Sequence, residues 1–260
     1  MRGMGKGGPT VGELASHGIM AAMIAGSLLF FIIALSDPPL LDAFTDYSVA
    51  ILSFLPVASG SILTRRYGPD SIFGRCFALL TAGLALWFLG EVLWPIHTRV
   101  LGIEMPSPSI MDVLWMAGYI FIGLGIYLML KMFWPASGPR RRAVIIASCF
   151  VAVASAIVLI LAPQIYEASP LELFIYEYYL ISDAILLGLL SILYRTFKGG
   201  RVSRAWLILA VGLTAISLAD AFFNLATSLG SGAHLLFSDL IYMNGYSLIA
   251  LGFVEHAKEL

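Results

Sequence analysis

The sequence of 260 residues is 60% hydrophobic and only 12% charged, whereas soluble domains average roughly 45 to 50% apolar and about 25% charged residues. This composition excludes an ordinary soluble domain and predicts a protein whose main partner is the lipid bilayer. The formal net charge of -1 gives no sign of the basic surface with which proteins bind nucleic acids.

Apolar runs near 20 residues, the length that crosses roughly 30 Å of hydrocarbon, follow one another along the chain. We expect an all-α fold, a polytopic membrane bundle of eight transmembrane helices. The predicted helices cover residues 17–36, 46–64, 73–96, 109–133, 143–162, 172–195, 204–229 and 235–255. Because the connections between them are short, the sequence predicts no separate soluble domain.

Basic residues are distributed unevenly between the predicted connections. One side of the membrane holds only Arg99, and the other holds Arg2, Lys6, Arg65, Arg66, Arg75, Lys131, Arg140, Arg141, Arg142, Arg195, Lys198, Arg201, Arg204 and Lys258. Basic residues of membrane proteins concentrate on the cytoplasmic side. The sequence therefore predicts a multi-pass protein of the cell membrane with both termini in the cytoplasm.

A short motif occurs twice: an acid, an aromatic residue three positions later, and a Gly-Tyr pair that ends seven positions later. The copies are Asp112, Trp115, Gly118 and Tyr119, then Asp239, Tyr242, Gly245 and Tyr246. On a helix these positions share one face. About 20 residues before each copy lies another acid in an apolar run, Glu91 or Asp220. The pattern indicates an internal repeat.

Eight spans give the two halves of the chain the same orientation. This predicts parallel repeats related by an axis near the membrane normal. The predicted domains are a cytoplasmic tail at residues 1–16, a first four-helix repeat at 17–133, a basic cytoplasmic linker at 134–142 and a second four-helix repeat at 143–260.

Acidic side chains gather in the outer half of the predicted bundle, and this is the main functional signal. The candidate ligand-binding residues are Glu91, Asp112, Tyr119, Glu177, Asp183, Asp220, Asn224, Asp239 and Tyr246. A charge at the bilayer centre costs about 2.5 to 3.5 kcal/mol even on a lenient scale, so these acids should face the interior and share protons, meet water or bind a cation. The expected ligand is a small polar or cationic molecule.

Structural roles are the alternative for some of these residues. Ser109 and Asp112 have the spacing of a capping box, and the helix dipole favours an acid in a first turn. Tyr176, Tyr178 and Tyr179 fit an aromatic belt at the membrane interface or ordinary packing. The histidines lack a metal-binding spacing and no serine has the setting of a nucleophile, so the sequence identifies no cofactor.

Several short motifs carry a resemblance to a known family: Trp87 with Glu91, Pro106-Ser107-Pro108-Ser109 before Asp112, Gly118-Tyr119, Tyr179-Leu180-Ile181-Ser182-Asp183, Asp220, and Asp239 with Gly245-Tyr246. Over about residues 45 to 255 the chain resembles the multi-span N-terminal membrane segment of bacterial diguanylate cyclases and related signalling proteins. The resemblance implies that the segment senses a signal and passes it through its last helix to a cytoplasmic output domain. Because the sequence stops at Leu260, we expect a removed domain, a separate output protein or a stand-alone relative.

Three functions fit these features. The favoured one is a ligand-responsive membrane sensor or receptor module with an outward-facing acidic and aromatic pocket. The second is a proton- or cation-coupled transporter that uses the same acids, although no helix is broken by Gly and Pro at matching places in both halves. The third is an intramembrane enzyme that acts on a lipid-like substrate through paired carboxylates, and it is the least favoured because no nucleophile is recognisable.

Overall fold

The computed structural model describes residues 10–103, 108–133, 169–229 and 232–260, and every regular element in these ranges is a helix. Seven segments of the described chain are long and apolar enough to cross a membrane: Val11–Ser36, Pro39–Tyr67, Ile72–Val100, Ile110–Met132, Pro170–Phe197, Ser203–Phe223 and Phe237–Lys258. The chain is therefore an all-α, multi-pass membrane protein. The predicted helix at 143–162 lies outside the described residues, so the total of eight stays a prediction.

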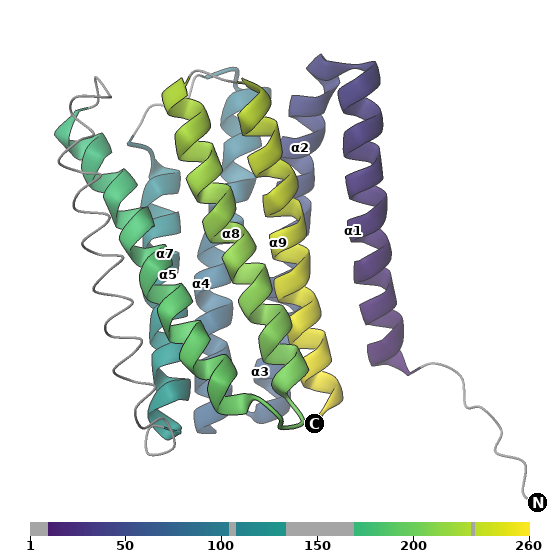
Figure 1. The fold of residues 1–260 in the computed structure, drawn as a ribbon, viewed down its shortest axis with the longest axis vertical. Helices are drawn as coiled ribbons and strands as arrows, with labels where there is room; N and C mark the ends of the chain where they lie inside the picture. The colour runs from purple at the N-terminus through teal and green to yellow at the C-terminus, as the bar shows by residue number, and fades with distance from the viewer. Residues whose placement is uncertain (1–9, 104–107, 134–168, 230–231) are drawn as a thin grey trace, which may run out of the picture.

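The helices stand side by side in one bundle (Figure 1). The first, α1 (Val11–Ser36), begins at the same end of the bundle at which the last, α9 (Gly232–Lys258), finishes. We call this the near end. The opposite end, where α5 (Ile110–Met132) and α7 (Pro170–Phe197) begin, is the far end.

The helix α1 lies at the edge of the bundle, where it packs against α9 and α2 (Figure 1). It begins at residue 11 rather than at the predicted 17, because Thr10 and Glu13 form a capping box. This cap satisfies backbone N–H groups of the first turn and makes a polar beginning stable. The first helix thus begins six residues before the predicted start at residue 17.

The second span consists of two helices instead of the single one predicted at 46–64. The helix α2 (Pro38–Leu52) starts at an Asp37 cap, and α3 (Phe54–Tyr67) follows after a break at Ser53. Pro56 has no N–H and cannot donate to the carbonyl of Leu52, which explains the position of the break. The buried Ser53 hydroxyl instead donates to the carbonyl of Ala50 at 2.9 Å.

The third span also changes its geometry near one end. The helix α4 (Ile72–Pro95) continues directly into η1 (Ile96–Val100), a π-helical turn at the far end. Pro95 cannot donate to the carbonyl of Glu91 four residues earlier, so the regular hydrogen-bond ladder stops at this acid. Arg99 in η1 forms a 2.6 Å ion pair with Asp46 of α2.

Two helix pairs pack most extensively: α4 with α5, and α8 (Ser203–Leu229) with α9. A Cβ built on Gly83 would lie 2.6 Å from the carbonyl oxygen of Gly118, and one on Gly212 would lie 2.8 Å from the backbone nitrogen of Ile249. Neither contact leaves room for a side chain. Small residues are what allow helices to approach this closely in a membrane, where packing drives helix association.

We expect the Gly83→Ala and Gly212→Ala variants to be less stable by about 1 to 3 kcal/mol each, because an added methyl forces the paired backbones apart. Gly18→Ala on α1 is the matched control, since nothing lies within 4 Å of a Cβ there. Unfolding of the purified protein in detergent, followed by circular dichroism, measures the difference. Equal stability of all three variants would contradict the close packing.

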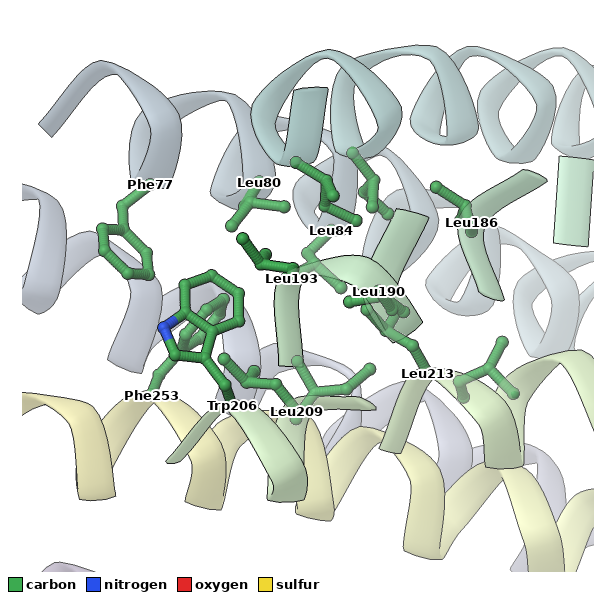
Figure 2. Close-up of a cluster of buried hydrophobic side chains, with 14 of the residues drawn as sticks. Phe77, Leu80, Leu84, Leu186, Leu190, Leu193, Trp206, Leu209, Leu213 and Phe253 are labelled. Atoms are coloured by element: carbon green, nitrogen blue, oxygen red, sulfur yellow. The ribbon is translucent and has the colours of Figure 1, made fainter. Parts of the chain in front are cut away.

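The buried apolar side chains form a dense layer toward the near end of the bundle (Figure 2). Figure 2 shows that side chains from α4, α7, α8 and α9 meet there, although these helices are far apart in the sequence. We call this set the apolar layer: Phe77, Leu80, Leu84, Leu186, Leu190, Leu193, Trp206, Leu209, Leu213 and Phe253. Dispersion contacts between such side chains are individually weak and collectively large.

Candidate functional site

Tyr119 lies in a buried polar cluster on the far-end side of the apolar layer. Its hydroxyl oxygen is 2.8 Å from Asp183 Oδ1 and 2.7 Å from Asp220 Oδ2. One phenol group of α5 therefore joins α7 and α8. The side chains of Tyr119 and Asp183 are only 5% and 7% exposed, so these hydrogen bonds are shielded from water and are correspondingly strong.

The two contacts of Tyr119 determine where a proton must lie. A phenol hydroxyl has one proton and donates one hydrogen bond. When both contacts are hydrogen bonds, Tyr119 donates one of them and a protonated Asp183 or Asp220 donates the other. Ser217 on α8 also donates to Asp183 Oδ1 at 2.8 Å. With both bonds made, one of these two carboxyl groups from neighbouring helices is protonated and donates to the Tyr119 oxygen.

Tyr246 makes the corresponding contact from the α8–α9 pair back to the α4–α5 pair. Tyr246 of α9 donates to Glu91 Oε1 of α4 at 2.8 Å, whereas Tyr119 of α5 contacts Asp220 of α8. Each tyrosine of the duplicated motif therefore bonds to the acid that precedes the other copy. Tyr242 of α9 adds a further donated bond to Asp220. These bonds connect the α4–α5 pair with the α8–α9 pair.

Asp112 caps its own helix and also holds a neighbouring helix. The predicted capping box is confirmed, because Asp112 Oδ2 accepts from the backbone N–H of Ser109 at 2.7 Å and the Ser109 hydroxyl caps the same turn. Asp112 Oδ1 also accepts from the Tyr179 hydroxyl of α7 at 3.0 Å. Tyr178 donates to the carbonyl of Met116 at 2.8 Å. Both tyrosines thus hold α7 against α5.

We call the following residues the tyrosine–carboxylate network: Glu91, Asp112, Tyr119, Tyr179, Asp183, Ser217, Asp220, Tyr242 and Tyr246. Within the described chain, none of its acids pairs with a Lys or Arg, since the ion pairs of Arg99, Arg201, Arg204 and Lys258 are with Asp46, Glu255 and Glu259. Charges without partners are costly in a bilayer. Protons or an entering cation must therefore neutralise the network.

Three predicted site residues lie elsewhere. Asp239 is beside Thr45 and Asp46 of α2, closer to the far end, where it also interacts electrostatically with Glu91. Glu177 belongs to a different surface of α7 that contributes to a groove with α5. The side chain of Asn224 lies outside the described part of the structure. The other six predicted residues, Glu91, Asp112, Tyr119, Asp183, Asp220 and Tyr246, belong to the network.

Sequence reasoning missed three network residues as site residues: Tyr179, Ser217 and Tyr242. Tyr242 was visible as the aromatic member of the second motif copy, and Ser217 lies one helical turn before Asp220. Both residues lie three positions from an acid on the same helix, and this spacing was the signal that could have identified them. Tyr179 gave the weaker signal of three clustered tyrosines, for which a membrane-interface belt or ordinary packing was the favoured interpretation.

The apolar layer separates the network from the near end. In α4, α5, α7, α8 and α9 the sequence has no charged residue between the acids and the basic residues or Glu255 close to the near end. The described residues in between that are polar and buried, such as Thr81 and Ser247, donate to carbonyls of their own helices. The network therefore has no polar connection to the near end in the part of the chain that the structure describes.

Comparison with protein-family models, with curated proteins and with solved structures found no match for this chain. The fold and the composition of its spans define a class, the multi-pass membrane proteins. Any more specific function within that class must be argued from the arrangement of the tyrosine–carboxylate network.

Proposed function

We propose that this protein is a membrane sensor in which the tyrosine–carboxylate network responds to a proton or a small cationic ligand and α9 reports the response. One observation supports this function most directly. Tyr119 and Tyr246 exchange hydrogen bonds between the α4–α5 and α8–α9 pairs through Asp220 and Glu91. Any change in the protonation or occupancy of these acids alters how the two pairs are held together.

We also propose that the two pairs belong to parallel repeats of four helices, at residues 17–133 and 143–260, with the near end in the cytoplasm of a cell. The same packing contacts recur in both halves: Gly83 with Ile122 and Gly125 with Leu80, then Gly212 with Ile249 and Gly252 with Leu209. The basic residues at the near end agree with this orientation.

The near-end part of α9 is suited to pass a movement to an output protein or domain. Arg66 of α3 donates to the carbonyl of Ala257 at 2.8 Å, and the Tyr67 hydroxyl lies 2.7 Å from His256 Nε2. Arg201, before α8, donates to the carbonyl of Glu259 at 3.0 Å. Other helices therefore hold the end of α9, and a shift of α9 along them changes what it presents to the cytoplasm.

A distance measurement tests this function. Both native cysteines, Cys76 and Cys149, are first replaced by alanine. New cysteines are then introduced as Lys131→Cys at the end of α5 and Leu260→Cys after α9, and each carries a spin label. The distance between the two labels reports the separation of the two helix ends. We expect Tyr119→Phe to shift this distance distribution, because it removes the bond between α5 and α8. Tyr127→Phe, an exposed tyrosine on the same helix, is the matched control and should leave the distribution unchanged.

The same protein in proteoliposomes distinguishes the sensor from a transporter. A sensor should show no proton or cation flux beyond that of empty vesicles, because the apolar layer offers no polar path to the near end through the helices that the structure describes. Flux that Asp183→Asn abolishes would establish transport instead. Distance distributions that are identical for Tyr119→Phe and the wild type, in the absence of flux, would contradict both functions.

A further inference from the structure

A groove of about 840 Å³ lies between α5 and α7 and is distinct from the tyrosine–carboxylate network. Pockets that enclose drug-sized molecules have comparable volumes. The exposed side chains of Ile120, Leu124, Phe174 and Ile185 contribute to its lining. Since these residues lie on helices long and apolar enough to span a membrane, the groove as the described residues form it faces molecules dissolved in the bilayer.

Glu177 is the one side chain among the described residues of this mainly apolar groove that can carry a charge near neutral pH. Glu177 is 7% exposed, and its buried Oε2 atom has no hydrogen-bond partner within the described structure. Its carboxyl group also takes part in no ion pair with the described Lys and Arg residues. A buried carboxylate oxygen without a donor is unfavourable. The groove thus lacks the donor or positive charge that its occupant can supply.

The apolar part of the groove continues from Glu177 along α7. Ile181, Ile185 and Leu189 follow at successive steps of four residues and line the same groove. At 1.5 Å per residue, the stretch from Glu177 to Leu189 is about 18 Å long. On the α5 side, a Cβ on Gly123 would meet only Leu186 Cδ2 at 3.8 Å, so the wall of the groove has free space at this position.

We propose that the groove binds a membrane-dissolved amphiphile that has a protonated primary amine at Glu177 and a hydrocarbon chain along Ile181, Ile185 and Leu189. Charge complementarity selects the head, and the apolar stretch accommodates the chain. Tyr119 both lines the groove and belongs to the network, so the occupant touches the ring whose hydroxyl joins α5 to α7 and α8. This effect on the network rests on the proposed function, whereas the binding itself does not.

Two sources can supply this chemistry: a free long-chain amine, or the ethanolamine headgroup of a phospholipid. The test uses the full chain in phosphatidylcholine nanodiscs and a photoreactive derivative of dodecylamine. Mass spectrometry maps the crosslinked peptides. The neutral control probe is the matching dodecanol derivative, which enters the bilayer equally but brings no positive charge.

We expect crosslinks to α5 and α7 for the amine and at least about tenfold fewer for the alcohol, as a difference of about 1.4 kcal/mol in binding would produce. Glu177→Gln should reduce the amine crosslinks to the level of the alcohol while leaving the fold intact. Gly123→Leu should also reduce them, because its side chain fills the groove. The control Gly18→Leu, at an open position on α1, should have no effect.

Equal labelling by the amine and the alcohol would overturn the proposal, as would amine labelling that persists in both Glu177→Gln and Gly123→Leu. Replacing half of the phosphatidylcholine with phosphatidylethanolamine distinguishes the two sources. Protection from labelling supports the headgroup, and undiminished labelling supports the free amine.

The proposed sensor function can fail separately from this binding site. If dodecylamine labels the groove but does not change the spin-label distance between α5 and α9, the site is real and the sensor function for this ligand is wrong. If that distance responds to a change of pH while dodecylamine and dodecanol label the groove equally, the sensor function stands and the amine site is wrong.

Discussion

The Tyr119→Phe variant should be less stable than the wild type by about 1 to 3 kcal/mol, the cost of losing one buried hydroxyl partner, because Asp183 keeps its bond from Ser217 and Asp220 keeps its bond from Tyr242. Tyr127→Phe on the same helix removes a hydroxyl from an exposed ring and should have no measurable effect. Unfolding of both variants in the same detergent, followed by circular dichroism, gives the comparison.

A double-mutant cycle separates the bond from other effects of the substitution. Tyr119→Phe combined with Asp220→Asn should show a coupling energy between about 0.5 and 3 kcal/mol, as expected for residues in direct contact. Additive effects of the two substitutions would mean that Tyr119 and Asp220 contribute independently, and the network would lose its central link.

The acidic proton shared around Tyr119 should be visible directly. We expect the infrared spectrum of the wild-type protein at neutral pH to contain a protonated carboxylic C=O band from the Asp183–Tyr119–Asp220 group. The band should disappear in the double variant Asp183→Asn/Asp220→Asn and persist in a control, Glu259→Gln, at the near end. A wild-type spectrum in which all carboxyl groups are ionised at neutral pH would contradict the proton assignment.

This proton also predicts the direction in which stability depends on pH. An aspartate in water is ionised near neutral pH, so the folded protein binds one proton more than the unfolded protein. Under this condition the free energy of unfolding decreases as pH rises. In the double variant Asp183→Asn/Asp220→Asn, the free energy of unfolding should decrease less as pH rises. Unfolding of both proteins measured across a pH series tests this difference.

Those features of the fold that depend on the sequence of a single helix were predictable. Each of the seven described spans overlaps a predicted helix, because apolar length is a property of a single segment. The capping box at Ser109 and Asp112 was predictable for the same reason. The break at Ser53 was not predicted, since the proline at position 56 does not by itself fix the residue at which the preceding helix ends.

The partners of the site residues were not predictable. The sequence grouped Asp112 with Tyr119 and Asp239 with Tyr246, because the members of each copy lie on one helix. In the folded chain Tyr119 bonds to Asp183 and Asp220, and Tyr246 bonds to Glu91. Such partners depend on which helices are neighbours in the bundle, and the spacing of residues within a helix carries no information about that.

The break between α2 and α3 has a mechanical consequence. Two short helices meet at Ser53, and because the N–H that Pro56 lacks is missing from the hydrogen-bond ladder there, the span bends more easily at this place than elsewhere. The far-end helix α2 carries Asp46, which is bound to Arg99 of η1, and the near-end helix α3 carries Leu63 of the buried apolar cluster. The break is thus the place in this span at which a displacement of the far end would bend the chain, while α3 keeps its packing against α4 and α9.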